Sequence, residues 1–115
     1  MDEAMNVGLE QEIIAELTIE LQGEPTFNAE ILALKVRNAI REVKMKRNYT
    51  ATSYTDKQIE RDLYNYFSTI KSVALYDYNQ IGADFEQSHS ENSVSRTWVS
   101  RDELFKGVHA FVRVL

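Results

Sequence analysis

The sequence predicts a mainly α fold, a small helical bundle of three longer helices and a short C-terminal helix. Apolar residues recur at helical spacing through residues 7–80, and capping residues flank the periodic stretches. Apolar and polar residues alternate only late in the chain, where we expect an extended arm or short β-hairpin around 85–99. The 115 residues suit one domain: the bundle, an arm over 83–99, and a short helix with a β-prone C-terminal tail over 100–115.

The first helix is expected from Val7 to Gln22. Asn6 is a candidate N-cap, and Gly23 followed by Pro25 marks the end of the helix. A stripe with four-residue spacing lies on one helix face, so we expect it to be buried. The stripe consists of Leu9, Ile13, Leu17 and Leu21.

The second helix is expected from about Phe27 or Asn28 to Arg47, with either Thr26 or Asn28 as its cap. Basic residues crowd its C-terminal end, where cations suit the helix dipole. A polar connector without helical periodicity follows over residues 48–53. The apolar stripe of this helix is Leu32, Val36, Ala39, Ile40 and Val43.

The third helix is expected from Thr55 to about Asn79, ending before Gly82. Thr55 and Gln58 have the spacing of a capping box, in which each satisfies a free backbone amide. Tyrosines widen the apolar face, and they suit either the edge of a core or a subunit interface. The apolar stripe is Ile59, Leu63, Phe67, Ile70 and Ala74.

The residues after Gly82 change in character. Residues 88–93 are typical of a turn, and residues 94–99 alternate between apolar and polar. The run Ser100-Arg101-Asp102-Glu103 resembles a capping box that opens a short helix, which Gly107 ends. Residues 108–115 are β-prone and too apolar for a free end in water, so we expect them to dock on their own bundle or on a partner.

The composition suggests a protein made and kept in a cytoplasm. The chain has no cysteine, which excludes disulfides and thiolate metal sites. Its apolar runs are far too short to span a membrane. It begins with the acidic Met1-Asp2-Glu3, and no apolar signal-peptide core follows. We therefore expect no membrane association.

Motifs that would indicate an enzyme are missing from the sequence. His89 and His109 are too far apart for a helical metal site, and the serines near residue 90 do not lie in a GxSxG pattern. Neither a Walker loop nor a GxGxxG sequence is present. We therefore expect no catalytic residue, no cofactor and no bound metal.

The charged residues are unevenly distributed, although the net charge is only −5. Residues 1–34 contain eight acids and no Lys or Arg, whereas residues 35–47 contain six bases and one acid. This asymmetry favours head-to-tail electrostatic contact, either between two helices of one chain or between copies of the chain. The bases could also contact DNA phosphates. These six residues, a candidate DNA-channel or inter-subunit patch, are Lys35, Arg37, Arg41, Lys44, Lys46 and Arg47.

The segment from Tyr78 to Trp98 resembles a stretch of the head–tail connector, or adaptor, proteins of tailed bacteriophages. Members tend to show a glycine-alanine pair, a serine-histidine-serine-glutamate run and a serine-arginine-aromatic run. In this chain the three pieces are Gly82-Ala83, Ser88-His89-Ser90-Glu91 and Ser95-Arg96-Thr97-Trp98, in that order. The chain departs from the family at Asn92-Ser93, where members often have Asn-Gly.

The resemblance implies a non-enzymatic subunit of the virion neck, synthesised in the cytoplasm of a bacterial host. Copies would form a ring, either on their own or only when templated, between the portal protein and the stopper or tail-completion protein, with DNA passing through the ring. The candidate partner-interface residues are Ser88, His89, Ser90, Glu91, Asn92, Ser95, Arg96, Trp98, Phe111 and Val114. The alternatives are a small helical DNA-binding, packaging or regulatory protein and a helical interaction module without a viral role.

Overall fold

The computed structural model describes residues 8–85 and 101–112, and these residues form the mainly helical bundle that the sequence predicts. This part of the chain contains no strand and four α-helices: α2 (Gly8–Leu21), α3 (Ala29–Arg47), α4 (Asp56–Tyr64) and α5 (Phe67–Phe85). Two short 3₁₀ helices are also present, η1 (Tyr49–Ala51) and η3 (Arg101–Phe105).

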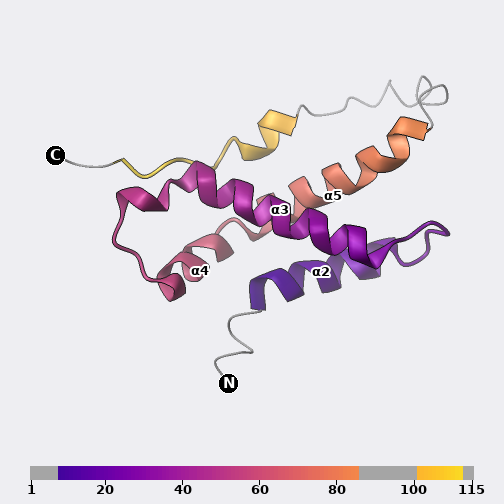
Figure 1. Ribbon diagram of the computed structural model, residues 1–115, viewed down its shortest axis with the longest axis horizontal. Helices are drawn as coiled ribbons and strands as arrows, with labels where there is room; N and C mark the ends of the chain where they lie inside the picture. The colour runs from indigo at the N-terminus through magenta and orange to yellow at the C-terminus, as the bar shows by residue number, and fades with distance from the viewer. Residues whose placement is uncertain (1–7, 86–100, 113–115) are drawn as a thin grey trace.

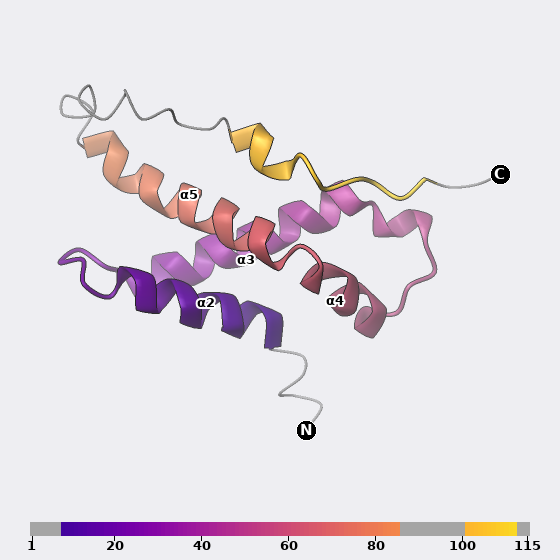
Figure 2. The same ribbon diagram turned by 180° about the vertical axis from the view of Figure 1, so that it is seen from behind.

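Helix α3 lies at the centre of the bundle. It makes its most extensive contact with α5, which it crosses, and it also touches α2 and α4 (Figure 1). The view from behind shows η3 and the C-terminal segment following the same side of the bundle as α5 and the end of α3 (Figure 2). One side of α3 is therefore packed in the core, while another side remains available to solvent.

The predicted apolar stripes form the core. Partly buried Ile40, Ile59 and Phe67 pack around it. Fully removing such a side chain from water contributes about 1.5–3 kcal/mol, so the aligned stripes are the main source of stability. The buried core residues are Leu9, Ile13, Leu17, Leu21, Leu32, Val36, Ala39, Val43, Leu63, Ile70, Val73, Ala74 and Phe105.

The helix ends follow the sequence signals in most places. Asn28, rather than Thr26, caps α3 by accepting a hydrogen bond from the Ile31 amide at 3.0 Å. The Thr55–Gln58 capping box of α4 is confirmed. Gly23 does not act as a left-handed C-cap, because its φ is not positive; instead the Glu24 amide donates to the Leu21 carbonyl at 2.9 Å. Asn6, the predicted cap of the first helix, lies outside the described residues.

The predicted third helix is two helices, α4 and α5. They are separated at Asn65 and Tyr66, whose amides donate to the carbonyls of Asp62 and Leu63, three residues back, at 3.0 and 2.8 Å. The run Tyr64-Asn65-Tyr66 consists of residues with low helix propensity, which makes it a weak point in a long helix. The break allows α4 to contact both α2 and α3 while α5 crosses α3.

Helix α5 continues past Gly82 to Phe85, so the expected start of an arm at residue 83 was wrong. One glycine inside a helix costs only about 1 kcal/mol relative to alanine, and no proline follows to stop the helix. The rest of the predicted arm or hairpin, residues 86–100, lies outside the described residues.

The C-terminal segment packs on the bundle. The predicted short helix is the 3₁₀ helix η3, from which Phe105 enters the core. The described part of the β-prone tail, residues 108–112, is not a strand. Instead the Phe111 amide donates to the Arg47 carbonyl at the end of α3, at 2.8 Å. The described part of the tail thus docks on its own bundle, one of the two outcomes expected from its apolar sequence.

Candidate assembly surfaces

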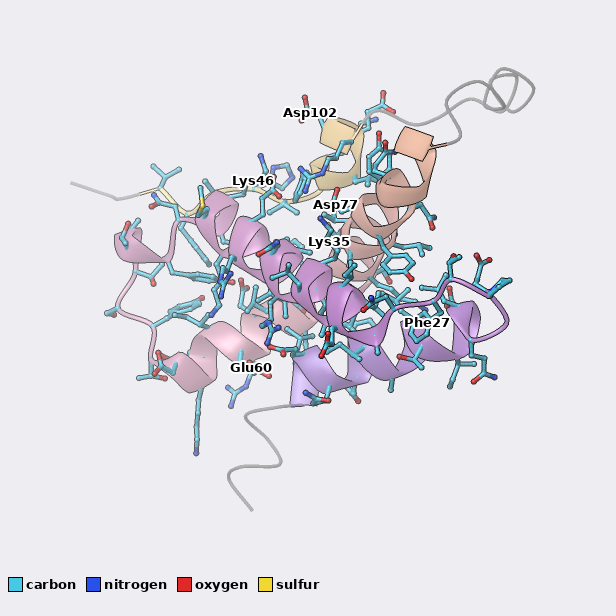
Figure 3. The ribbon with its side chains drawn as sticks, turned by 45° about the vertical axis from the view of Figure 1, so that its right-hand side comes forward. Phe27, Lys35, Lys46, Glu60, Asp77 and Asp102 are labelled. Carbon is cyan, nitrogen blue, oxygen red and sulfur yellow. The ribbon has the colours of Figure 1, made fainter. Side chains whose placement is uncertain are left out.

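The predicted basic patch divides into exposed and occupied residues. Arg37, Arg41 and Lys44 are exposed on one side of α3, and no ion pair joins them to an acid within the described ranges. Lys35 is half-buried. Lys46 lies beside the C-terminal segment (Figure 3), with its Nζ 4.7 Å from the centre of the Phe105 ring. Only part of the patch is therefore free to meet a partner.

Arg47 does not belong to the exposed patch, contrary to the sequence prediction. It is buried and cannot meet DNA or another subunit. Its Nε and Nη2 donate to the two Asp62 carboxylate oxygens at 2.8 and 3.0 Å, and its Nη1 donates to the His109 carbonyl. The guanidinium lies over the rings of Tyr66 and Phe111, 4.9 and 4.0 Å from their centres. Because a guanidinium offers five donors in one plane, it can hold α4 and the C-terminal segment together.

The charges in this cluster support one another. Hydrogen bonding to Asp62 raises the pKa of Arg47 above its ordinary value. Burial acts to raise the pKa of Asp62, but the hydrogen bonds from Arg47 and Tyr49 outweigh it and lower that pKa. Burial, together with the 2.6 Å hydrogen bond that its hydroxyl donates to Asp62, raises the pKa of Tyr49. The cluster therefore carries a fixed ion pair at neutral pH.

Phe111, predicted to face a partner, is instead part of this cluster. Its ring packs 5.9 Å from Tyr49 and 5.3 Å from Tyr54, and its carbonyl accepts a hydrogen bond from Asn48. Asn48 has a left-handed backbone, with φ of 58°, which ends α3 and directs its side chain to the tail. The other predicted partner-facing residues, 88–98 and Val114, lie outside the described residues.

Arg101 anchors η3 at a second charged site. Its guanidinium donates to both carboxylate oxygens of Glu42 on α3, at 2.7 and 2.9 Å. It also donates to both oxygens of Asp77 on α5, each at 2.8 Å. These hydrogen bonds hold the pKa of Glu42 below its ordinary value and raise that of Arg101. Arg101, the first described residue after Phe85, is thus tied to two helices of the bundle.

The acids of α2 form an exposed face. Glu12, Glu16 and Glu20 recur every four residues, and Ile19 lies among them with 66% of its surface exposed. Lys71 of α5 bridges Glu16 and Glu20 at 2.9 and 2.7 Å. The acidic helix does lie beside the basic one, since α2 contacts α3. However, no ion pair links α2 to α3 in the described parts of the chain.

Sequence reasoning did not identify Asp62, Glu42 or Arg101 as structural residues. Arg47 and Asp62 are 15 positions apart, and Arg101 and Glu42 are 59 apart. No local spacing signals such pairs. The only available hint was that Glu42 is a single acid within a basic stretch.

The described residues contain neither a metal-binding cluster nor a pocket with a free carboxylate. No cluster of His, Asp and Glu among them could hold a metal ion. Of the two histidines, His89 lies outside these residues and His109 is exposed. An open pocket beside α4 is lined by Tyr54, Gln58, Arg61, Asp62 and Asn65. Asp62 is the one carboxylate in this lining, and it already pairs with Arg47. It is therefore not free to bind a ligand or to act as an acid or base.

None of the described helices is long and apolar enough to cross a membrane. Comparisons with protein-family models, curated proteins and solved structures found no match to this chain.

Proposed function

We propose that this chain is a structural subunit of a bacteriophage neck. Copies form a ring between the portal protein and the stopper or tail-completion protein, and DNA passes through the ring. The mainly helical bundle and the resemblance of residues 78–98 to the head–tail connector family support the proposal. The subunit acts by binding and has no catalytic role.

The observation that carries the proposal is the anchoring of Arg101. The segment that resembles the connector family begins within α5, which packs on α3. It ends shortly before η3, which Arg101 ties to Glu42 and Asp77. The described residues before and after 86–100 therefore belong to one bundle, in which α5 contacts η3. Such anchoring lowers the entropic cost of presenting a segment to the portal or the stopper.

The proposal can be tested with the portal protein encoded in the same genome. The mass of the purified chain is measured by light scattering with and without portal, and the complex is imaged by electron microscopy. We expect a ring of this chain on one end of the portal. If the chain stays monomeric and unbound in both samples, it is not a neck subunit.

A length-preserving variant identifies the segment that binds. Replacing residues 88–98 by an equal number of Gly and Ser residues should leave helicity unchanged and abolish joining of heads to tails. Loss of far-ultraviolet helical signal in this variant would instead assign the segment to the core.

The second candidate is a DNA-binding protein of packaging or regulation, and the observation that favours it is the exposed row Arg37, Arg41 and Lys44. A gel-shift titration at several salt concentrations distinguishes the two. Contact with about three phosphates would make log K fall with log salt at a slope of about −3. Binding lost on Arg37→Glu/Arg41→Glu would favour this second function.

A further inference from the structure

We propose that the exposed face of α3 in one copy of this chain binds the exposed face of α2 in a second copy. The inference rests on the proposed ring and names its subunit contact. We call the two surfaces the basic face and the acidic face. The basic face consists of Leu34, Arg37, Arg41, Lys44 and Met45, and the acidic face consists of Glu12, Ala15, Glu16, Ile19 and Glu20.

The basic face combines charge with apolar surface. Leu34 and Met45 lie near its two ends and are 45% and 78% exposed. Between them Arg37, Arg41 and Lys44 are exposed, and Arg41 donates a hydrogen bond to the amide oxygen of the neighbouring Asn38. Exposed apolar side chains beside bases are typical of protein interfaces, whereas a DNA backbone offers them no apolar partner.

The acidic face also combines exposed apolar and charged side chains, but its charge is negative. Ala15 and Ile19 form an exposed apolar strip, and Glu12, Glu16 and Glu20 lie along one side of it. Lys71 neutralises part of this face from α5, yet Glu16 and Glu20 remain 50% and 47% exposed. The face therefore keeps carboxylates that a second chain can reach.

The spacing of the two faces matches. Arg37 and Arg41 are four residues apart, as are Glu12 and Glu16, which corresponds to about 6 Å along each helix. With these pairs opposed in a parallel arrangement, Ile19 comes opposite the region of Met45. The antiparallel arrangement also opposes Arg37 and Arg41 to acids, so charge matching holds in both directions.

The basic face and the acidic face of one chain do not pair with each other. Although α2 and α3 touch, their exposed charges do not pair with each other among the described residues. A contact between two different surfaces is heterologous, and each bound copy still offers one free face of each kind. Repetition of this contact produces a ring or an open filament, depending on whether the rotation between copies closes.

Charge reversal with complementation tests the pairing. The acidic-face variant is Glu12→Lys/Glu16→Lys, which leaves Lys71 its bond to Glu20, and the basic-face variant is Arg37→Glu/Arg41→Glu. Lys57→Glu/Arg61→Glu, at the same spacing on the exposed side of α4, is the matched control. Circular dichroism melts verify that all three variants fold. Sedimentation then measures association up to about 1 mM protein in about 0.05 M and about 0.5 M salt.

The wild-type chain should self-associate at low salt and less at high salt. Each face variant alone should associate at least about tenfold more weakly, since attraction becomes repulsion at two positions. An equimolar mixture of the two face variants should associate again, because every contact in it joins opposite charges. The Lys57→Glu/Arg61→Glu control should behave as the wild type does.

The inference is overturned if the wild-type chain is monomeric at about 1 mM, if the face variants associate as the wild type does, or if their mixture stays monomeric. Portal binding separates this result from the proposed function. A portal-bound ring that forms equally well with the basic-face variant would keep the function and refute the pairing. Self-association that depends on both faces, without any portal binding, would support the pairing and refute the proposed function.

Discussion

Replacing Arg47 by methionine should destabilise the protein more than any exposed substitution would. Methionine keeps an unbranched apolar stem but removes the guanidinium, and with it the charge and every donor. The change leaves Asp62 with a hydrogen bond from Tyr49 and without a counter-charge. It also removes the donor to the His109 carbonyl and the cation over the Phe111 ring.

The expected loss follows from the burial of the pair. The side chains of Arg47 and Asp62 are only 11% and 13% exposed, so solvent screens their interaction little. Removing one partner of a buried ion pair costs about 3–5 kcal/mol. Tyr49 continues to solvate the Asp62 carboxylate, which places the expected loss near the lower end, at about 3 kcal/mol.

Urea unfolding followed by circular dichroism measures this loss at neutral pH. A double-mutant cycle with Asp62→Asn isolates the pair, since the double variant lacks both charges. We expect Arg47→Met/Asp62→Asn to lose at least about 1 kcal/mol less than the two single losses added together. A loss below about 1 kcal/mol for Arg47→Met, or simple additivity in the cycle, would refute the argument from burial.

The Arg47–Asp62 pair also predicts the direction in which stability changes with pH. Because the pKa of Asp62 is lower in the folded than in the unfolded protein, its pairing stabilises the fold above the ordinary pKa of a carboxyl group. That contribution is lost as the pH falls through the folded pKa. The stability difference between the wild type and Arg47→Met should therefore shrink in acid and stay constant around neutrality. A difference that grows in acid would contradict the assignment.

Three other substitutions have separate outcomes. Arg101→Ala should lower the free energy of unfolding in urea by about 1–2 kcal/mol, a moderate loss because one third of the Arg101 side chain is exposed. The loss should become smaller as Glu42 is protonated in acid, and an unchanged urea midpoint would show that Arg101 does not anchor η3. Phe111→Ala should cost about 1 kcal/mol or slightly more and speed amide exchange in the tail, whereas unaltered exchange would mean the ring does not hold the tail. Thr55→Ala should lower stability by about 1 kcal/mol, with Thr55→Ser close to wild type, and equal melting of both would exclude the cap.

The local parts of this fold are predictable from the sequence because their causes are local. Leu9, Ile13, Leu17 and Leu21 share a helix face through their spacing alone, and all four are buried. The Thr55–Gln58 box needs only residues three apart. The fold class follows from these signals, since amphipathic helices of this length must bury one face against another.

The break between α4 and α5 could not be predicted in the same way. The stripe from Leu63 to Ile70 keeps helical spacing across the break, so periodicity alone favours one continuous helix. Tyr66 lies under the Arg47 guanidinium, and Asp62 pairs with it, so the contacts around the break come from α3. Tertiary contacts of this kind override weak propensities and leave no pattern in the local sequence.

The charge asymmetry was visible in the sequence, but only the structure sorts the charges by role. Buried Arg47 donates to both carboxylate oxygens of Asp62, and anchored Arg101 donates to both of Glu42 and both of Asp77. Each joins distant segments, so its loss should lower stability. Exposed Arg37 and Arg41 bridge no carboxylate among the described residues, so their loss should leave stability nearly unchanged. An effect of Arg37 and Arg41 on association would then reflect surface pairing, because unfolding cannot account for it. The two pairs of arginines therefore let one set of measurements separate what folds this chain from what assembles it.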